Sequence, residues 1–186
     1  MAQTWRMPST APKQRRPAPP LTGEKMERLA LRYVERFATT RGRLADYLRR
    51  KIRERGWEGA PADPDALAER LAGLGYIDDR AFAEARATAM ARRGLGARRV
   101  QDALRHARVG AEDTEALAPE IEERGPEAAL AFARRKRFGP FAAERADRER
   151  MGKQLAAMAR AGHGYELSRR ILELPPGAEI EPEELL

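Results

Sequence analysis

Apolar residues recur every three or four positions through most of the chain, which is the period of a helix that buries one face. No segment alternates apolar and polar residues over the length of a strand. The pattern therefore predicts an all-α protein of about nine helices. Representative stripes are Leu44, Tyr47, Leu48 and Ile52; Leu67, Leu71 and Leu74; Val100, Ala103, Leu104 and Ala107; and Leu167, Ile171 and Leu174.

Glycine and aromatic residues recur at a regular distance along the chain. We interpret the glycines as ends of helices and the aromatic residues as lying near the start of a first helix in each unit. A period near 50 residues accommodates three helices. The glycines are Gly56, Gly110 and Gly162, spaced 54 and 52 residues apart, and the aromatic residues are Tyr33, Phe82 and Phe132, spaced 49 and 50 apart.

This period predicts three tandem three-helix repeats, each resembling a helix-turn-helix unit. We place them at residues 24–78, 79–125 and 126–174. Units of this size bury too little surface alone, so they should pack on one another in an elongated or curved row.

Two flanking segments differ from the repeats in composition. Residues 1–23 hold five prolines and four basic side chains but no acid, and this composition predicts a disordered basic arm. At the other end, Pro175 and Pro176 should stop the last helix, and residues 175–186 form an acidic tail.

The motif GYIDDRAF could hold paired catalytic carboxylates, metal ligands or the start of a helix. Its sequence favours a junction between helices, because Gly75 can adopt the left-handed conformation that ends one helix. Asp78 is suited to cap the next helix, with Asp79 in its first turn. Ile77 and Phe82 then have the spacing of a hydrophobic staple. The motif residues are Gly75, Tyr76, Ile77, Asp78, Asp79 and Phe82.

The composition narrows the environment and the classes of function. The chain has no cysteine, which excludes disulfides and thiolate chemistry and suits a reducing compartment. Its longest apolar run, residues 128–133, is too short for a membrane span, so we expect a cytoplasmic protein. The net charge of +7 favours partners rich in phosphate or carboxylate.

Charge alternates in sign along the chain. Residues 41–55, 92–108 and 134–160, taken as the middle helices of the repeats, have net charges of +5, +5 and +6. Residues 63–79 and 111–127, taken as third helices, have net charges of −4 and −6. The basic helices either bind a partner or form solvated faces that the acidic helices of neighbouring repeats balance.

The arginines of the basic helices are the candidate partner-binding residues. On a helical projection, Arg49, Arg50 and Arg53 lie opposite the apolar stripe of their helix, as Arg98 and Arg105 do in the next basic helix. Apolar faces can then pack while arginines project outward. The candidate set is Arg49, Arg50, Arg53, Arg92, Arg93, Arg98, Arg99 and Arg105.

The sequence argues against an enzyme. RRGLGARR resembles a phosphate-binding loop, but no strand precedes it and no Gly-Lys-Ser/Thr follows, so Gly94 and Gly96 are interpreted as a helix connection. His106 and His163 have no nucleophile or orienting carboxylate at a recognisable spacing. We expect no catalytic residue, metal or cofactor.

Two long segments resemble the RecX family, bacterial regulators of the RecA recombinase. LGYIDDRAFAEARATAMARRGLGARRVQDALR is similar to the central signature of that family, and YVERFATTRGRLADYLRRKIRERG is similar to its opening module. The strong match covers about residues 28–110. Ala97 stands where many members have proline, and Thr-Arg-Gly-Arg-Leu stands where many have Ser-Arg-x-Glu-Leu.

The resemblance implies an all-helical protein that lies in the groove of the RecA–DNA filament. It implies inhibition of ATP hydrolysis and strand exchange, with roles in DNA repair and the SOS response. The arginines would contact filament carboxylates or the phosphates of single- or double-stranded DNA. We expect a monomer and no membrane partner. The alternative function is a stand-alone DNA-binding protein of low sequence specificity, because the basic helices are poor in the residues that read bases.

Overall fold

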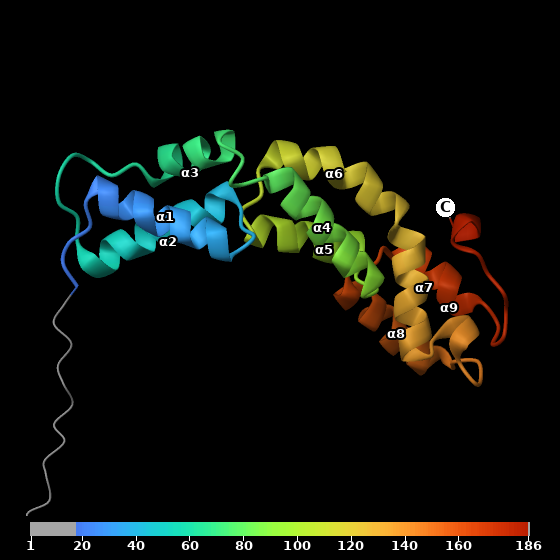
Figure 1. Cartoon of the computed structure of the whole chain (residues 1–186). Helices are drawn as coiled ribbons and strands as arrows, with labels where there is room; N and C mark the ends of the chain where they lie inside the picture. The colour runs from blue at the N-terminus through green and yellow to red at the C-terminus, as the bar shows by residue number, and fades with distance from the viewer. Residues whose placement is uncertain (1–17, 186) are drawn as a thin grey trace, which may run out of the picture.

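Residues 18–185 are described by a computed structural model, and helices account for most of them (Figure 1). No strand occurs in this range, so the predicted all-α class is confirmed. The helices are α1 (Gly23–Arg36), α2 (Arg41–Arg55), α3 (Pro64–Gly73), α4 (Asp79–Arg92), α5 (Ala97–His106), α6 (Ala111–Glu123), α7 (Gly125–Lys136), α8 (Arg148–Ala161) and α9 (Tyr165–Glu173), with short 3₁₀ turns η1 (Gly139–Phe141) and η2 (Pro182–Leu185).

Side-chain caps explain where several helices begin. Thr22, Thr40, Asp63, Asp78 and Asp147 precede α1, α2, α3, α4 and α8, and each side chain accepts a hydrogen bond from the first turn of its helix. The predicted cap of the GYIDDRAF motif is confirmed, because the Asp78 carboxylate accepts from the Ala81 amide at 2.8 Å. Gly75 has φ of +80°, as its predicted place after a helix requires.

Three separate groups of buried side chains stabilise the helices in threes. Leu44, Leu48 and Leu71 lie at the centre of the first, among α1, α2 and α3. Val100, Leu104 and Leu117 join α4, α5 and α6. Phe132, Met158 and Ile171 join α7, α8 and α9. Each set of three helices therefore has its own core, and we call the three sets repeats 1, 2 and 3.

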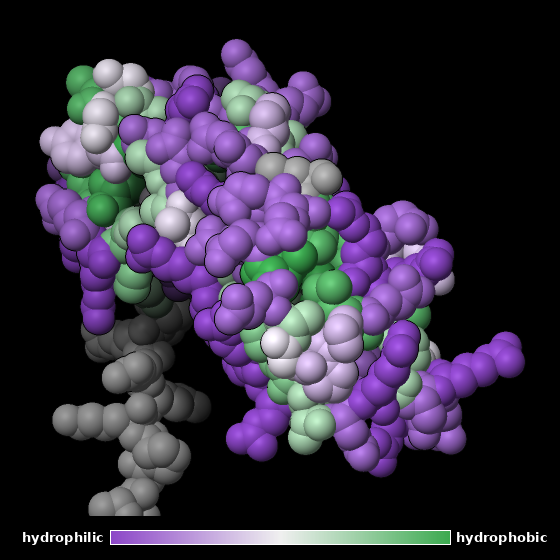
Figure 2. Space-filling model, turned by 90° about the vertical axis from the view of Figure 1, so that its right-hand side faces the viewer, coloured by the Kyte–Doolittle hydropathy of each residue, from purple (hydrophilic) through white to green (hydrophobic). Residues whose placement is uncertain are grey.

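The repeats follow one another in a curved row. In Figure 1, α3 and α6 run along the outer, convex edge, while α2, α5 and α8 lie along the inner edge. The end formed by repeat 3 is largely hydrophilic, with a smaller hydrophobic area in its middle (Figure 2). The sequence-predicted acidic and basic helices of repeats 1 and 2 thus lie on opposite edges of the arch.

The two flanking segments pack more closely than their composition predicted. Most of the predicted arm, residues 1–17, lies outside the described range. Leu21, however, is fully buried and exchanges backbone hydrogen bonds with Gly56 and Glu58 at 3.0 and 2.9 Å. The acidic tail folds back onto repeat 3, where Leu185 is buried in the core. The Arg170 guanidinium donates to the Leu185 carbonyl at 2.9 Å.

Three details of the predicted pattern are wrong. Leu74 does not join the buried stripe of α3 but caps the helix and is 65% exposed. Residues 134–160 do not form one basic helix, because Gly139, with φ of +52°, and the following turn separate α7 from α8. The aromatic spacing does not mark equivalent sites, since Tyr33 lies late in α1 and Phe82 early in α4. The three glycines do follow the second helix of each repeat.

Candidate partner-binding surface

The candidate arginines of α2 differ in how far acidic neighbours already neutralise them. Arg49 pairs with Asp46 at 2.9 Å and with Asp65 of α3, and hydrogen bonding to Asp65 raises the pKa of its guanidinium. The Arg50 guanidinium lies 5.7 Å from the centre of the Tyr47 ring, and its Nε is 4.0 Å from the Glu54 carboxylate. Arg53 has no ion pair within residues 18–185. Of these three arginines, only Arg50 and Arg53 therefore offer much charge that acidic neighbours do not neutralise.

Four further candidates come together around one turn. Arg92 ends α4 and Arg93 caps it, Arg98 and Arg99 lie in the first turn of α5, and the Gly94–Gly96 turn joins the two pairs. All four are exposed, and none of their guanidinium groups has an ion pair in the described part of the chain. The turn therefore concentrates positive charge at the boundary of repeats 2 and 3. We call Arg92, Arg93, Arg98 and Arg99 the turn arginines.

Arg105, the last candidate, lies apart from the turn arginines near the other end of α5. It pairs with Asp102, one turn earlier in the same helix. Because an exposed pair of this kind leaves little net charge, Arg105 is a weaker candidate for binding than its sequence position predicted.

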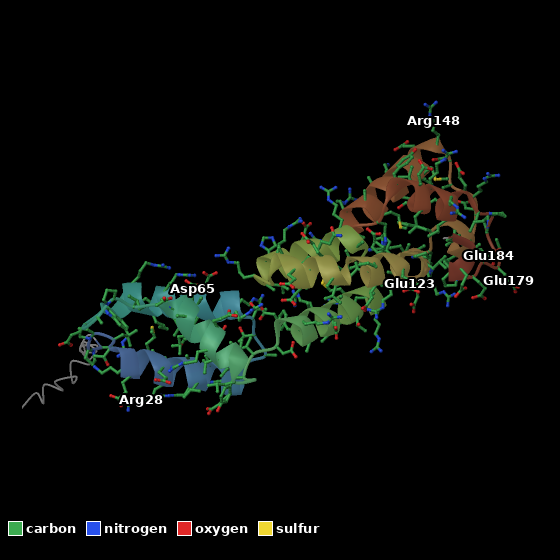
Figure 3. All side chains as sticks on the ribbon, turned by 90° about the horizontal axis from the view of Figure 1, so that it is seen from above. Arg28, Asp65, Glu123, Arg148, Glu179 and Glu184 are labelled. Atoms are coloured by element: carbon green, nitrogen blue, oxygen red, sulfur yellow. The ribbon has the colours of Figure 1, made fainter. Side chains whose placement is uncertain are left out.

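Seen from above, the labelled Arg148 and Glu184 project on opposite sides of repeat 3 (Figure 3).

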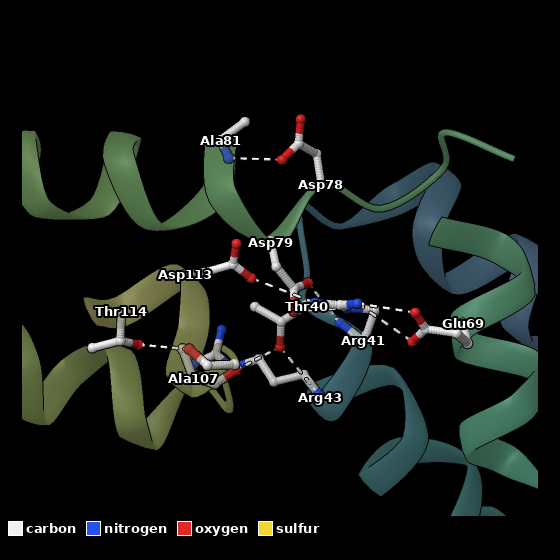
Figure 4. Close-up of polar contacts among 11 residues, drawn as sticks. Thr40, Arg41, Arg43, Glu69, Asp78, Asp79, Ala81, Ala107, Asp113 and Thr114 are labelled. Atoms are coloured by element: carbon white, nitrogen blue, oxygen red, sulfur yellow. Dashed lines mark hydrogen bonds and ion pairs between the residues drawn. The ribbon is translucent and has the colours of Figure 1, made fainter. Parts of the chain in front are cut away.

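The relative placement of repeats 1 and 2 depends on polar contacts at the start of α2 (Figure 4). The Asp79 carboxylate, 4% exposed, accepts from the Arg41 amide at 2.9 Å and from the Arg41 guanidinium at 3.2 Å. The Thr40 hydroxyl donates to the Ala107 carbonyl at 2.5 Å. The bond from the Arg41 amide to Asp79 satisfies one of the backbone amides that the start of a helix leaves without a partner. Asp79 is therefore more than a favourable charge in the first turn of α4.

Arg41 joins this contact to helices of both repeats. Its guanidinium lies 3.0 Å from Glu69 of α3 and 3.4 Å from Asp113 of α6. Hydrogen bonding to Asp79 is the main cause that raises the pKa of Arg41. Beside it, Gly42 faces the Arg108 backbone, whose carbonyl oxygen would lie 2.8 Å from an added Cβ. A larger residue at position 42 would therefore push the two repeats apart.

The junction of repeats 2 and 3 is a close packing of two glycine turns. The Gly96 amide donates to the Ala161 carbonyl at 2.9 Å, and an added Cβ on Gly96 would lie 2.7 Å from the His163 amide nitrogen. Gly94 approaches the Phe132 backbone equally closely. RRGLGARR is a helix connection, as predicted, and its glycines are needed because two backbones meet there.

His163 lies within this second junction. It is 7% exposed, its Nε2 is 3.2 Å from the Gly94 carbonyl, and its Nδ1 has no hydrogen-bond partner in the described chain. The contact requires the tautomer that carries its proton on Nε2. Burial lowers the pKa of His163, so the neutral form predominates at neutral pH.

Sequence analysis singled out Asp79, Gly94 and Gly96 as parts of helix connections but missed their contacts between repeats, because no local pattern identifies contacts between distant residues. Thr40 stands where many members of the family have serine, whereas Arg41 matches the arginine of the family pattern, so the departure from that pattern gave no signal for the Arg41 contact. The residues in contact at the junctions are far apart in sequence: Arg41 and Asp79 by 38 positions, and Gly94 and His163 by 69.

No helix in the described residues is long and apolar enough to cross a membrane.

Comparison with known proteins gives consistent matches. The chain is 32% identical over 164 residues to "Regulatory protein RecX" of Myxococcus xanthus (strain DK1622), covering 81% of this chain and 86% of that protein. It is 30% identical over 149 residues to "Regulatory protein RecX" of Agrobacterium fabrum (strain C58 / ATCC 33970), covering 78% and 80%. No family model matches the chain.

A solved structure shares the fold. The crystal structure of RecX from Lactobacillus salivarius matches with a TM-score of 0.62 over 81% of this chain and 94% of that chain. The sequence identity is 18%, so this match supports the architecture alone.

Proposed function

This chain belongs to the RecX family of regulatory proteins, and from that premise we propose that it binds along the RecA–DNA filament and inhibits RecA. Inhibition would lower ATP hydrolysis and strand exchange and so limit recombination during DNA repair and the SOS response. The protein acts as a monomer in the cytoplasm, and each copy spans neighbouring protomers of the filament.

The observation that supports this proposal most directly is the segregation of charge on a curved row of repeats. The basic helices α2, α5 and α8 lie along the inner edge of the arch, away from acidic α3 and α6 (Figure 1). A curved array of fixed repeats can follow a helical polymer over a longer path than one small domain can.

The turn arginines are the residues we expect to contribute most to binding. A guanidinium that is already paired must give up an internal contact before it binds a partner, whereas an unpaired one does not. The turn arginines lie near the middle of the row and have no acidic partner within residues 18–185. Filament carboxylates and DNA phosphates are both suitable partners for such a cluster.

The test is ATP hydrolysis by RecA preassembled on single-stranded DNA. We expect inhibition at or below equimolar protein. A variant with all four turn arginines changed to alanine should inhibit at least tenfold less strongly at low salt, with a smaller difference as salt rises. Unchanged hydrolysis at saturating wild-type protein contradicts the proposal.

The chain offers a control with the same change in net charge. Arg28, Arg80, Arg150 and Arg169 are exposed arginines outside the candidate set, and they pair with Glu24, Glu84, Glu144 and Glu173. Changing these four to alanine should leave inhibition within about twofold of wild type, because such surface pairs contribute little. An equal loss of inhibition in both variants would mean that binding depends on the total charge of the protein and not on the turn arginines. Tight, sequence-selective duplex binding without RecA would favour the stand-alone DNA-binding alternative.

A further inference from the structure

A groove of about 730 Å³ runs along the exposed side of α4, where repeat 1 meets repeat 2. Its walls include the aromatic side chains of Tyr76 and Phe82 and the apolar side chains of Met90 and Leu95. Tyr76 is 52% exposed and shares the groove with these other apolar side chains, and contiguous exposed apolar surface of this kind is typical of interaction sites. The groove lies outside the three cores, although Ile77 of the first core forms part of its wall.

The side of α4 that faces this groove is built for close approach by another backbone. Ala81, Ala85 and Ala89 recur every four residues along it, and all three are exposed. Because alanine side chains are small, a second helix can pack here with its axis about 8 Å from that of α4, the short end of the range for packed helices. The helix has 14 residues, so the face is about 21 Å long and accommodates about four turns of a partner helix.

Two arginines give the groove a positive rim. Arg86 and Arg93 both line it, and neither guanidinium has an ion pair or hydrogen bond in the range 18–185. They are seven residues apart on the same side of α4, or about 10.5 Å along the helix axis. The one acid in the lining, Asp78, caps α4 through the Ala81 amide. The field over the groove therefore favours a negatively charged occupant.

From this geometry we infer that the α4 groove binds an acidic amphipathic helix of a partner protein. An apolar row on that helix packs over the three alanines, between Tyr76 and Phe82. Two carboxylates about seven residues apart on its flank pair with Arg86 and Arg93. Charge excludes the basic residues 1–17 of this chain as the occupant, and the acidic tail is held on repeat 3 through Leu185.

The test is titration of the full-length protein with a labelled helical peptide of 16 residues, read by fluorescence anisotropy. The peptide has leucines every four residues on one face and glutamates seven residues apart beside them. A matched control peptide has lysine in place of each glutamate. We expect the glutamate peptide to bind at least tenfold more tightly at low salt.

Variants then place the binding site. Tyr76→Ala should weaken binding about tenfold, as loss of an exposed aromatic anchor does, and Arg86→Ala with Arg93→Ala should weaken it to a similar extent. Reversing both charges, with Arg86→Glu and Arg93→Glu, should make the lysine peptide the better ligand. Arg80→Ala is the control on the same helix, because Arg80 pairs with Glu84 and lies outside the groove lining. It should have no effect.

Three results would overturn the inference. They are equal affinity for the two peptides, equal effects of Arg80→Ala and the rim variants, or no saturable binding by the glutamate peptide. Sedimentation supplies another: a wild-type dimer that Tyr76→Ala dissociates would make a second copy the occupant. Because the titration contains neither RecA nor DNA, its outcome does not depend on the proposed function.

Discussion

Asp79→Ala is the substitution that most directly tests how repeats 1 and 2 are held together. Asp79 lies on α4, yet both of its described hydrogen bonds go to Arg41 at the start of α2. Removing the carboxylate leaves the Arg41 amide without its partner and takes one of three acidic neighbours from the Arg41 guanidinium. The substitution thus removes a contact between repeats and leaves the apolar cores unchanged.

The two lost bonds differ in strength. The amide bond is short and the Asp79 side chain is 4% exposed, so its loss should cost about 2 kcal/mol. The guanidinium is 36% exposed and keeps Glu69 and Asp113, so that part should cost about 1 kcal/mol. The sum of about 3 kcal/mol corresponds to a fall of about 6 to 12 °C in unfolding temperature for a chain of this size.

Scanning calorimetry and urea titration measure this change. Asp65→Ala is the matched control, because Asp65 pairs with Arg49 on the surface and is 67% exposed; it should cost no more than about 0.5 kcal/mol. In a double-mutant cycle with Arg41→Ala, the coupling energy should equal the guanidinium part, about 1 kcal/mol. If Asp79→Ala unfolds within 2 °C of wild type, the junction does not depend on this carboxylate and the reasoning is refuted.

Three further predictions concern repeat 3 and its junction. The free energy of unfolding should fall as the pH drops below 6.5, because burial lowers the pKa of His163 and the unfolded chain therefore binds the proton first. Urea titrations of His163→Gln should lack this part of the pH dependence. Gly96→Ala should lower the free energy of unfolding by about 2 kcal/mol, because its Cβ would overlap the backbone of the α8–α9 turn. Gly152→Ala, in open space on α8, is the control and should raise the free energy of unfolding by about 0.5 to 1 kcal/mol; calorimetry measures both changes. Leu185→Ala should cost about 2 kcal/mol and reduce hydrogen-exchange protection in α7 but not in α2.

Most of the helical structure could be predicted from the chain alone. The period of apolar positions located the helices, and capping residues such as Asp78 located some of their starts. The prediction failed at Leu74, where the apolar spacing continues past the true end of α3, and over residues 134–160, predicted as one basic helix although Gly139 and Pro140 separate α7 from α8. In both cases the decisive contact or conformation is not encoded in the hydrophobic period.

The candidate site was only partly predictable. The sequence showed that the middle helices are basic, but not that Asp65 and Asp102 already neutralise Arg49 and Arg105. Nor did it show that the predicted turn at Gly94 and Gly96, with arginines on both sides, packs against repeat 3. Exposed charge depends on which acids lie within a few ångströms, and only the tertiary structure brings distant acids that close.

By itself, the sequence determined that this protein is helical and that its basic residues concentrate on the second helix of each predicted repeat, and it predicted repeats of about 50 residues. These properties depend on backbone hydrogen bonds and side-chain spacings that extend about four residues along the chain. The tertiary structure decided how the units join, through the bond from Arg41 to Asp79 and the packing of Gly96 on the α8–α9 turn. These contacts link residues far apart in sequence, and whether they form depends on shape and burial that arise only after the helices have packed.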